Sequence, residues 1–202
     1  MIPVISWIIL HGRCRTCKNK ISWLYPFIEM LTAIIMTLLI IQIPLHFVPA
    51  YFILFSALIV TIRTDIETML ISRFTSLFLV PVGTLFSVLK LLPLSPFNSI
   101  LGAMIGYLIP YIFSKIFKYF TGKEGIGAGD FELLACIGAF TGILGCWLSL
   151  VIGSLLGSLF GLTQLISGKA SRSTKIPFGP FLAVGCIIFV LLQNIMLKFF
   201  LF

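Results

Sequence analysis

Apolar residues fill most of the chain in long runs that short polar stretches interrupt. A membrane-crossing helix needs ~20 mostly apolar residues. On that basis the runs predict seven spans, at roughly 25–45, 47–62, 74–93, 96–117, 130–144, 146–167 and 178–198. Prolines lie at or beside most of the proposed turns, where a missing backbone N–H does least harm. The pattern therefore predicts an all-α, polytopic integral membrane protein with about seven transmembrane helices.

Composition supports a membrane protein and excludes an ordinary soluble domain. Hydrophobic residues make up 59% of the chain and charged residues only 10%, whereas soluble domains carry about 25% charged residues. The net charge of +8 does not indicate a nucleic-acid partner, because the 14 Lys and Arg residues stand in small clusters between apolar runs. We expect a lipid bilayer as the environment and no nucleic acid as a partner.

The basic residues also predict the orientation of the chain. Under the seven-span model, only Lys90 and Lys198 fall on one side of the membrane, and the other basic residues all fall on the opposite side: Arg13, Arg15, Lys18, Lys20, Arg63, Arg73, Lys115, Lys118, Lys123, Lys169, Arg172 and Lys175. Loops rich in Lys and Arg remain in the cytoplasm. The N-terminus is therefore expected in the cytoplasm. Residues 1–24 form a cytoplasmic or interfacial segment with one CxxC motif, and residues 25–202 form the transmembrane domain.

Two of the six acidic residues are candidates for acid–base chemistry. Asp65 follows the second predicted span and Asp130 begins the fifth, so the model places both on the cytoplasmic side. Two aspartates that meet can share one proton, which makes one a base for water and the other an acid for a carbonyl group. Asp65 could instead pair with Arg63, and Asp130 could instead cap a helix N-terminus.

Gly127 and Gly129 precede Asp130 and favour the catalytic interpretation. Glycine lets a backbone take unusual dihedral angles or lets a substrate backbone approach closely. No Ser–His–Asp or Cys–His arrangement is evident in the sequence. Hydrolysis by a serine or cysteine nucleophile is therefore not expected.

Four segments resemble the type IV prepilin peptidases, bacterial membrane enzymes of the GxGD aspartic protease group. They are HGRCRTCKNKISWLYPFIEMLTA (11–33), TDIETMLISRFT (64–75), GKEGIGAGDFELLACIGAFTG (122–142) and KIPFGPFLAVG (175–185). By this resemblance Asp65 and Asp130 become the catalytic pair, Gly127 and Gly129 become the loop glycines, and residues 25–202 become a transmembrane peptidase domain.

The resemblance also implies a substrate and a location. A member of this family would sit in the bacterial inner membrane and remove the basic leader of type IV prepilins, or of type II secretion pseudopilins, usually after a glycine. Many members then methylate the new N-terminus with S-adenosylmethionine. The peptide cleavage itself would need no cofactor.

The chain departs from the family at three places. Dual-function members have two CxxC pairs, whose four thiolates suit a structural zinc ion, but here only Cys14 and Cys17 are present. These could be half of a zinc site or two reduced free thiols. Either the true start lies upstream of Met1, or this is a shortened form without the metal and the methyltransferase. Ser72 and Arg73 stand where the family commonly has Pro and Asp or Asn, and Glu132 stands where Lys is usual.

Glu29 lies in the first span, and we expect it to pair with a basic loop residue, because an unpaired carboxylate at that depth is costly. A role in methyl transfer is the alternative for Glu29. Glu67 is expected to be a solvated surface acid. Two other functions remain open: a transporter in which Asp65, Asp130 and Glu29 relay protons or ions, and a truncated, impaired peptidase.

Overall fold

The computed structural model describes residues 3–122, 127–168 and 176–200, with side chains as far as residue 193. Its helices are α1 (Pro3–Ile9), α2 (Leu24–Gln42), α3 (Val48–Thr68), α4 (Leu79–Val88), α5 (Pro96–Thr121), α6 (Ala128–Ile166) and α7 (Gly179–Phe200). Within the described ranges, strand-like pairing is limited to an isolated bridge between Arg13 and Lys20. The all-α prediction is confirmed.

The chain forms two compact units, Met1–Gln42 and Ile43–Phe202. The first contains α1 and α2, and the indole Nε1 of Trp7 donates a 3.1 Å hydrogen bond to the Ile21 carbonyl oxygen, which links α1 to the loop before α2. The second contains α3 to α7. The division of the chain after residue 24 stays a prediction, since it separates a loop from a span rather than one compact unit from another.

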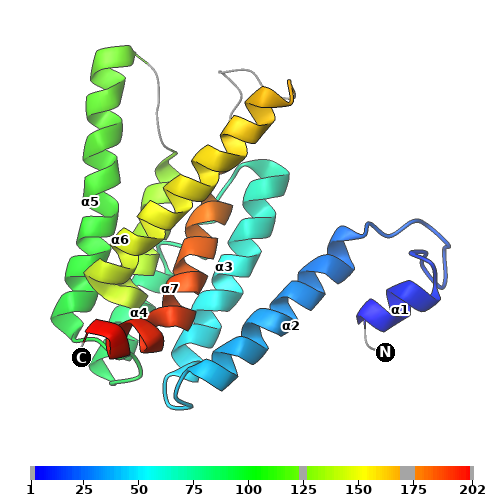
Figure 1. Cartoon of the computed structure of the whole chain (residues 1–202), viewed down its shortest axis with the longest axis horizontal. Helices are drawn as coiled ribbons and strands as arrows, with labels where there is room; N and C mark the ends of the chain where they lie inside the picture. The colour runs from blue at the N-terminus through cyan, green and yellow to red at the C-terminus, as the bar shows by residue number, and fades with distance from the viewer. Residues whose placement is uncertain (1–2, 123–126, 169–175, 201–202) are drawn as a thin grey trace. The chain divides into compact units, whose positions relative to one another are not determined.

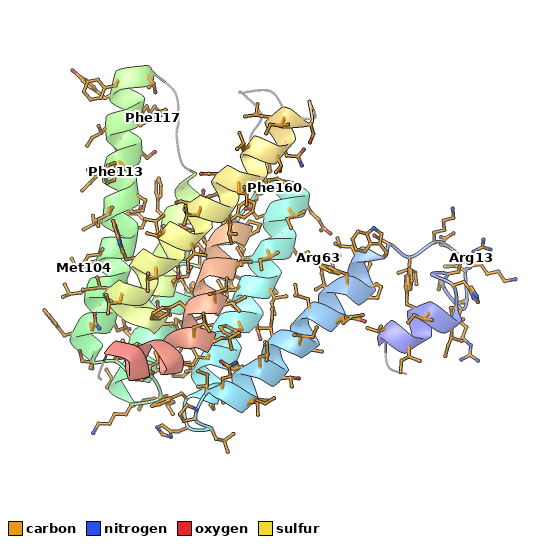
Figure 2. The ribbon with its side chains drawn as sticks, viewed as in Figure 1. Arg13, Arg63, Met104, Phe113, Phe117 and Phe160 are labelled. Carbon is orange, nitrogen blue, oxygen red and sulfur yellow. The ribbon has the colours of Figure 1, made fainter. Side chains whose placement is uncertain are left out.

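Four helices, α2, α3, α5 and α6, are long and apolar enough to cross a bilayer. The helices α4 and α7 add shorter apolar segments. On α5, the side chains of Met104, Phe113 and Phe117, which are labelled in Figure 2, are 47–65% exposed. Large apolar side chains on the outside of a bundle suit contact with lipid. The protein is a polytopic membrane protein, as predicted.

The helix α6 is two helical arms that reverse direction at Gly142. There the backbone has φ 71° and ψ −170°, outside the helical region. The Cys146 thiol lies 3.7 Å from the Leu134 carbonyl oxygen, although twelve residues of straight helix would span ~18 Å. Figure 1 shows the second arm running back beside the bundle toward the end where α6 began. The two arms correspond to the predicted spans 130–144 and 146–167.

The predicted span 74–93 is shorter in the structure, where α4 covers only ten residues. The residues before it, 69–78, are called here the α3–α4 connection. In it, the Ser72 hydroxyl accepts from the Phe74 N–H at 3.3 Å, and the Ser76 hydroxyl donates to the Ser72 carbonyl oxygen at 3.1 Å. Such side-chain bonds offer the backbone an alternative to helical pairing. They explain why an apolar run long enough for a span begins as a turn.

The first arm of α6 packs against α5 through close backbone contact. A methyl group added to Gly106 would lie 2.5 Å from the Leu134 carbonyl oxygen, and one added to Gly138 would overlap the Gly102 carbonyl group. The Ser99 hydroxyl donates to the Ala139 carbonyl oxygen at 2.6 Å. Small residues allow this approach where the lipid gives no hydrophobic driving force between helices. Residues 130–142 are all buried as a result.

The ends of the helices agree with the predicted sorting of charges within the second unit. In Figure 1, α3, α5 and the second arm of α6 end at one end of the bundle, where α7 begins. Lys118 lies in the last turn of α5, Arg63 lies five residues before the end of α3, and Lys90 follows α4. Lys123, Lys169, Arg172 and Lys175 lie outside the described residues, as does Glu124.

Candidate active site

Asp65 lies where the end of α3 meets the start of α7. It occupies the last turn of α3, and its Oδ2 accepts a 3.0 Å hydrogen bond from the backbone N–H of Gly179, the first residue of α7. The first N–H groups of a helix lack intrahelical partners and carry partial positive charge. The start of α7 therefore provides a donor for a carboxylate that is only 5% exposed.

Asp130 is held in a similar way by the start of α6. Gly127 is the N-cap residue, which makes Asp130 the third residue of the helix, and the backbone N–H of Gly127 hydrogen-bonds the Asp130 carboxylate. A side chain that returns from the third position to the N-cap N–H satisfies a donor that the helix leaves free. The capping alternative for Asp130 is thus correct in part, although Gly127 occupies the N-cap position itself.

The two aspartates come together at one end of the bundle. Both are buried, with Asp130 9% exposed, and the two carboxylates lie within range of each other's charge. Three helix ends contribute: the C-terminus of α3 and the N-termini of α6 and α7. The structure therefore places the two predicted carboxylates in one polar cluster. Their catalytic role, and that of Gly127 and Gly129, stays a prediction.

Ile71 of the α3–α4 connection lies between the two glycines that border this pair. A methyl group on Gly129 would lie 2.9 Å from Ile71 Cβ, and one on Gly179 would lie 3.1 Å from Ile71 Cδ1 and 2.8 Å from Asp65 Oδ2. Neither glycine could therefore carry a side chain without displacing its neighbours. Sequence reasoning identified Gly129 but not Gly179 or Ile71, which no local pattern links to the aspartates.

Glu132 connects the same segment to α6. Its Oε1 lies 3.3 Å from Arg73 Nε, and its Oε2 accepts from the Ser76 hydroxyl at 3.4 Å. The Glu132 side chain is 9% exposed, whereas that of Arg73 is 80% exposed. On the other side, the hydroxyls of Thr75 and Thr61 lie 3.2 Å apart, which joins the connection to α3. Side-chain contacts thus hold the α3–α4 connection to both aspartate-bearing helices.

The other acid near Asp65 lies on the surface. Glu67 is exposed and forms an ion pair with Arg63, with Oε1 and Nε 3.2 Å apart. This is an ordinary pairing between residues four apart on a helix. Glu67 is the surface acid that the sequence predicts. The alternative in which Arg63 pairs with Asp65 stays a prediction.

In the first unit, Cys14 and Cys17 lie on a tight turn. Hydrogen bonds from the backbone N–H groups of Cys17 and then Thr16 lower the pKa of the Cys14 thiol, and a thiolate is the form that binds metals. A closed structural zinc site needs four ligands. Among the described residues, however, no group of three or more His, Cys, Asp or Glu side chains could hold a metal ion. In the described part of the chain, Cys14 and Cys17 therefore do not have the further ligands that a closed zinc site needs.

Glu29 lines a hollow of about 270 Å³ in the first unit, together with Arg13, Trp7 and Tyr25. The expected ion pair with a basic loop residue does not form in the described structure, where the ion pairs are those of Arg63 and Arg73. S-adenosylmethionine carries an ammonium, a carboxylate and a sulfonium group. An acid, a guanidinium and an aromatic ring are chemically suited to those three groups. The predicted role of Glu29 in methyl transfer remains a prediction.

Comparison with known families decides what kind of protein this is. The model of the type IV leader peptidase family matches residues 52–162, the range that holds both aspartates. The chain belongs to the type IV leader peptidase family. Residues 1–43 match the bacterial peptidase A24 N-terminal domain, which closely follows the first compact unit.

Relatives named prepilin leader peptidase/N-methyltransferase resemble the chain over most of its length. The protein from Aeromonas salmonicida is 37% identical over 91% of this chain, that from Xanthomonas campestris is 35% identical over 93%, and that from Neisseria gonorrhoeae is 32% identical over 93%. The chain spans 63–66% of the length of these relatives. No solved structure matches it.

Proposed function

We propose that this leader peptidase family member is a membrane aspartic endopeptidase whose catalytic residues are Asp65 and Asp130. The observation that carries the proposal is the meeting of two buried carboxylates at one end of a bundle, each bound by the N–H of a helix start. Like charges a few Å apart resist full ionisation, so such a pair tends to hold one proton between its members. That shared proton is what acid–base hydrolysis of a peptide bond requires.

The reaction needs one ionised and one protonated carboxyl group. The ionised carboxylate accepts a proton from water as the water oxygen bonds to the substrate carbonyl carbon. The protonated carboxyl gives its proton to the carbonyl oxygen. The C–N bond then breaks as the protonated member of the pair gives its proton to the amine nitrogen. The other carboxylate takes the proton of a hydroxyl group on the former carbonyl carbon, so the pair returns to its starting protonation state. The hydrogen bonds from Gly127 and Gly179 hold the carboxylates in position for both steps.

The proposed substrates are type IV prepilins or type II secretion pseudopilins. The names of the relatives point to prepilin leaders, and a pilin's apolar helix could lie beside the lipid-facing helices. We further propose that the chain sits in the bacterial inner membrane with its N-terminus and the aspartates on the cytoplasmic side. The positions of Arg63 and Lys118 at the aspartate end support this orientation.

The test is to replace each aspartate by asparagine and to follow leader removal from a type IV prepilin by immunoblot. Asp65→Asn and Asp130→Asn should each abolish processing while the protein still inserts and accumulates, because asparagine keeps the shape but cannot exchange the proton. Glu67→Gln, two residues from Asp65 and on the surface, is the matched control and should process normally. Normal processing by either aspartate variant would overturn the dyad and favour a proton- or ion-coupled transporter.

A second activity, methyl transfer to the new N-terminus, is favoured by the hollow around Glu29 and Arg13. S-adenosylmethionine would supply the methyl group when bound, and Glu29, Arg13 and Trp7 would hold its charged ends. Glu29→Gln should reduce labelling of mature pilin by a radioactive methyl donor while leader removal continues. Unchanged labelling in that variant would exclude Glu29 from the activity, and no labelling by the wild-type chain would exclude the activity itself.

A further inference from the structure

We propose that Ile71 determines the size of the substrate residue that precedes the cut. This inference rests on the proposed peptidase function. It assigns a role in substrate specificity to an apolar residue that takes no part in the proton transfers. It follows from the space that Ile71 occupies between the two helix starts at the aspartate pair.

The Ile71 side chain fills the gap that Gly129 and Gly179 leave. The distances to a methyl group at these positions, 2.9 Å from Ile71 Cβ at Gly129 and 3.1 Å from Ile71 Cδ1 at Gly179, are below or at the short limit of ordinary carbon contacts. The same methyl group on Gly179 would lie 2.8 Å from Asp65 Oδ2. A side chain that approaches the Asp65 carboxylate from the side of Gly179 therefore meets Ile71.

Ile71 is also held in place. The α3–α4 connection contacts α6 through Arg73 and Ser76, which both reach Glu132, and contacts α3 through Thr75. Isoleucine is branched at Cβ and has few accessible side-chain rotamers. The side chain therefore acts as a wall of fixed shape, and a large substrate residue cannot push it aside at little cost.

The chemistry identifies which substrate residue meets this wall. The carbonyl carbon that water attacks is bonded directly to the Cα of the residue before the cut, whereas the nitrogen of the broken bond separates it from the residue after. The side chain before the cut is thus the nearer one to the carboxylates. With Ile71, Gly129 and Gly179 in place, the structure favours glycine at that position.

The test compares two substrates with the full chain in membrane vesicles. A type IV prepilin with glycine before the cut, and the same prepilin with alanine there, are each assayed for kcat/KM. One additional methyl group in a closed site typically changes this constant by about 10–200-fold. Ile71→Ala should raise the alanine-to-glycine ratio of kcat/KM by about tenfold or more. Leu70→Ala is the matched control, since Leu70 is adjacent but 70% exposed, and should leave the ratio unchanged.

Two outcomes overturn the inference while the peptidase function stands. One is an unchanged ratio in Ile71→Ala with the glycine substrate still cut. The other applies if Ile71→Ala fails to accumulate in the membrane. Ile71→Val, which lacks only the Cδ1 carbon nearest Gly179, should then raise the alanine-to-glycine ratio of kcat/KM by a smaller factor. An unchanged ratio in Ile71→Val would overturn the proposal. If the wild-type chain cuts neither substrate, the proposed peptidase function itself fails and the inference fails with it.

Discussion

Arg73 and Glu132 are 59 positions apart in sequence and form an ion pair, with Nε and Oε1 3.3 Å apart. Glu132 lies two residues after Asp130 on α6. The resemblance to the type IV prepilin peptidases predicts Asp or Asn at the first position and Lys at the second. Where a relative has Asp and Lys there, this chain has the opposite charge at both positions. In this chain the ion pair attracts the α3–α4 connection to α6.

Exchanging these charges should show that the two residues act together. Arg73→Asp alone places two acids side by side, and Glu132→Lys alone buries a second cation beside Arg73. Each should lower the free energy of unfolding by about 1–3 kcal/mol, less than for a fully buried pair because Arg73 is largely exposed. The double variant should recover most of the lost free energy of unfolding, as measured by thermal unfolding in detergent.

Exchanging the surface pair Arg63 and Glu67 is the control and should change the free energy of unfolding by less than ~0.5 kcal/mol. Additive losses in the double variant would contradict the pairing.

Gly179→Ala should impair catalysis more than folding. Its methyl group would lie 2.8 Å from Asp65 Oδ2 and would displace the carboxylate from its N–H donor. A displacement of about 1 Å at a catalytic group can cost up to 10²-fold in rate, so we expect kcat/KM for leader removal to fall by about 10–100-fold.

Gly157→Ala is the matched control, because its methyl group would find an ordinary contact, 3.4 Å from Phe181 Cδ2. Its kcat/KM should remain close to that of the wild type. Equal losses of kcat/KM in the two variants would show that the close contact with Asp65 is not the cause of the loss in Gly179→Ala.

Gly142→Ala should destabilise the second unit. With φ 71° and ψ −170°, this residue lies in a region that is essentially restricted to glycine and costs other residues of order 1–3 kcal/mol. Its methyl group would also lie 2.9 Å from Asn98 Nδ2. Gly122→Ala is the comparison, since Gly122 has φ 69° but none of the described residues lies within 4 Å of an added methyl group, and the substitution should cost about 1 kcal/mol. Thermal midpoints in detergent measure both, and a larger effect at Gly122 would contradict the expectation.

Replacing both Cys14 and Cys17 by serine should leave leader removal within about twofold of wild type, because the aspartates need no metal to activate water. The wild-type chain should bind zinc weakly or not at all within one molecule, since two thiolates supply half of a closed site. Metal analysis of the purified chain, and mass spectrometry of the mature pilin for cleavage and methylation separately, check the two parts. Loss of cleavage in a stable, inserted double variant would place the cysteine turn in the peptidase site.

The sequence predicted most of the helices because a bilayer imposes length and hydrophobicity on every span. It also predicted that Asp65 and Asp130 share one end of the bundle, since counting the spans between them determines the side. It failed at span 74–93, where hydroxyl groups of Ser72 and Ser76 stabilise a turn that hydropathy cannot detect.

Contacts between distant residues were the other part that the sequence could not supply. Glu132 is a departure from the family in the sequence, and its partner Arg73 becomes evident only when the helices are packed. Gly179 was part of a recognised segment, but its hydrogen bond to Asp65 spans 114 positions. Pairwise packing of this kind leaves no periodic pattern in a single chain.

The reversal at Gly142 also decides which aqueous compartment each later residue faces. As one straight helix, the 39 residues of α6 would extend ~58 Å, about twice the ~30 Å apolar thickness of a bilayer. A straight helix would deliver α7 to the membrane face opposite Asp130. Gly179 would then be separated from Asp65 by the whole bilayer. The conformation of Gly142 thus makes the chain cross the bilayer twice, rather than once, between Asp130 and Gly179. Only an even number of crossings returns Gly179 to the membrane face where it donates to Asp65.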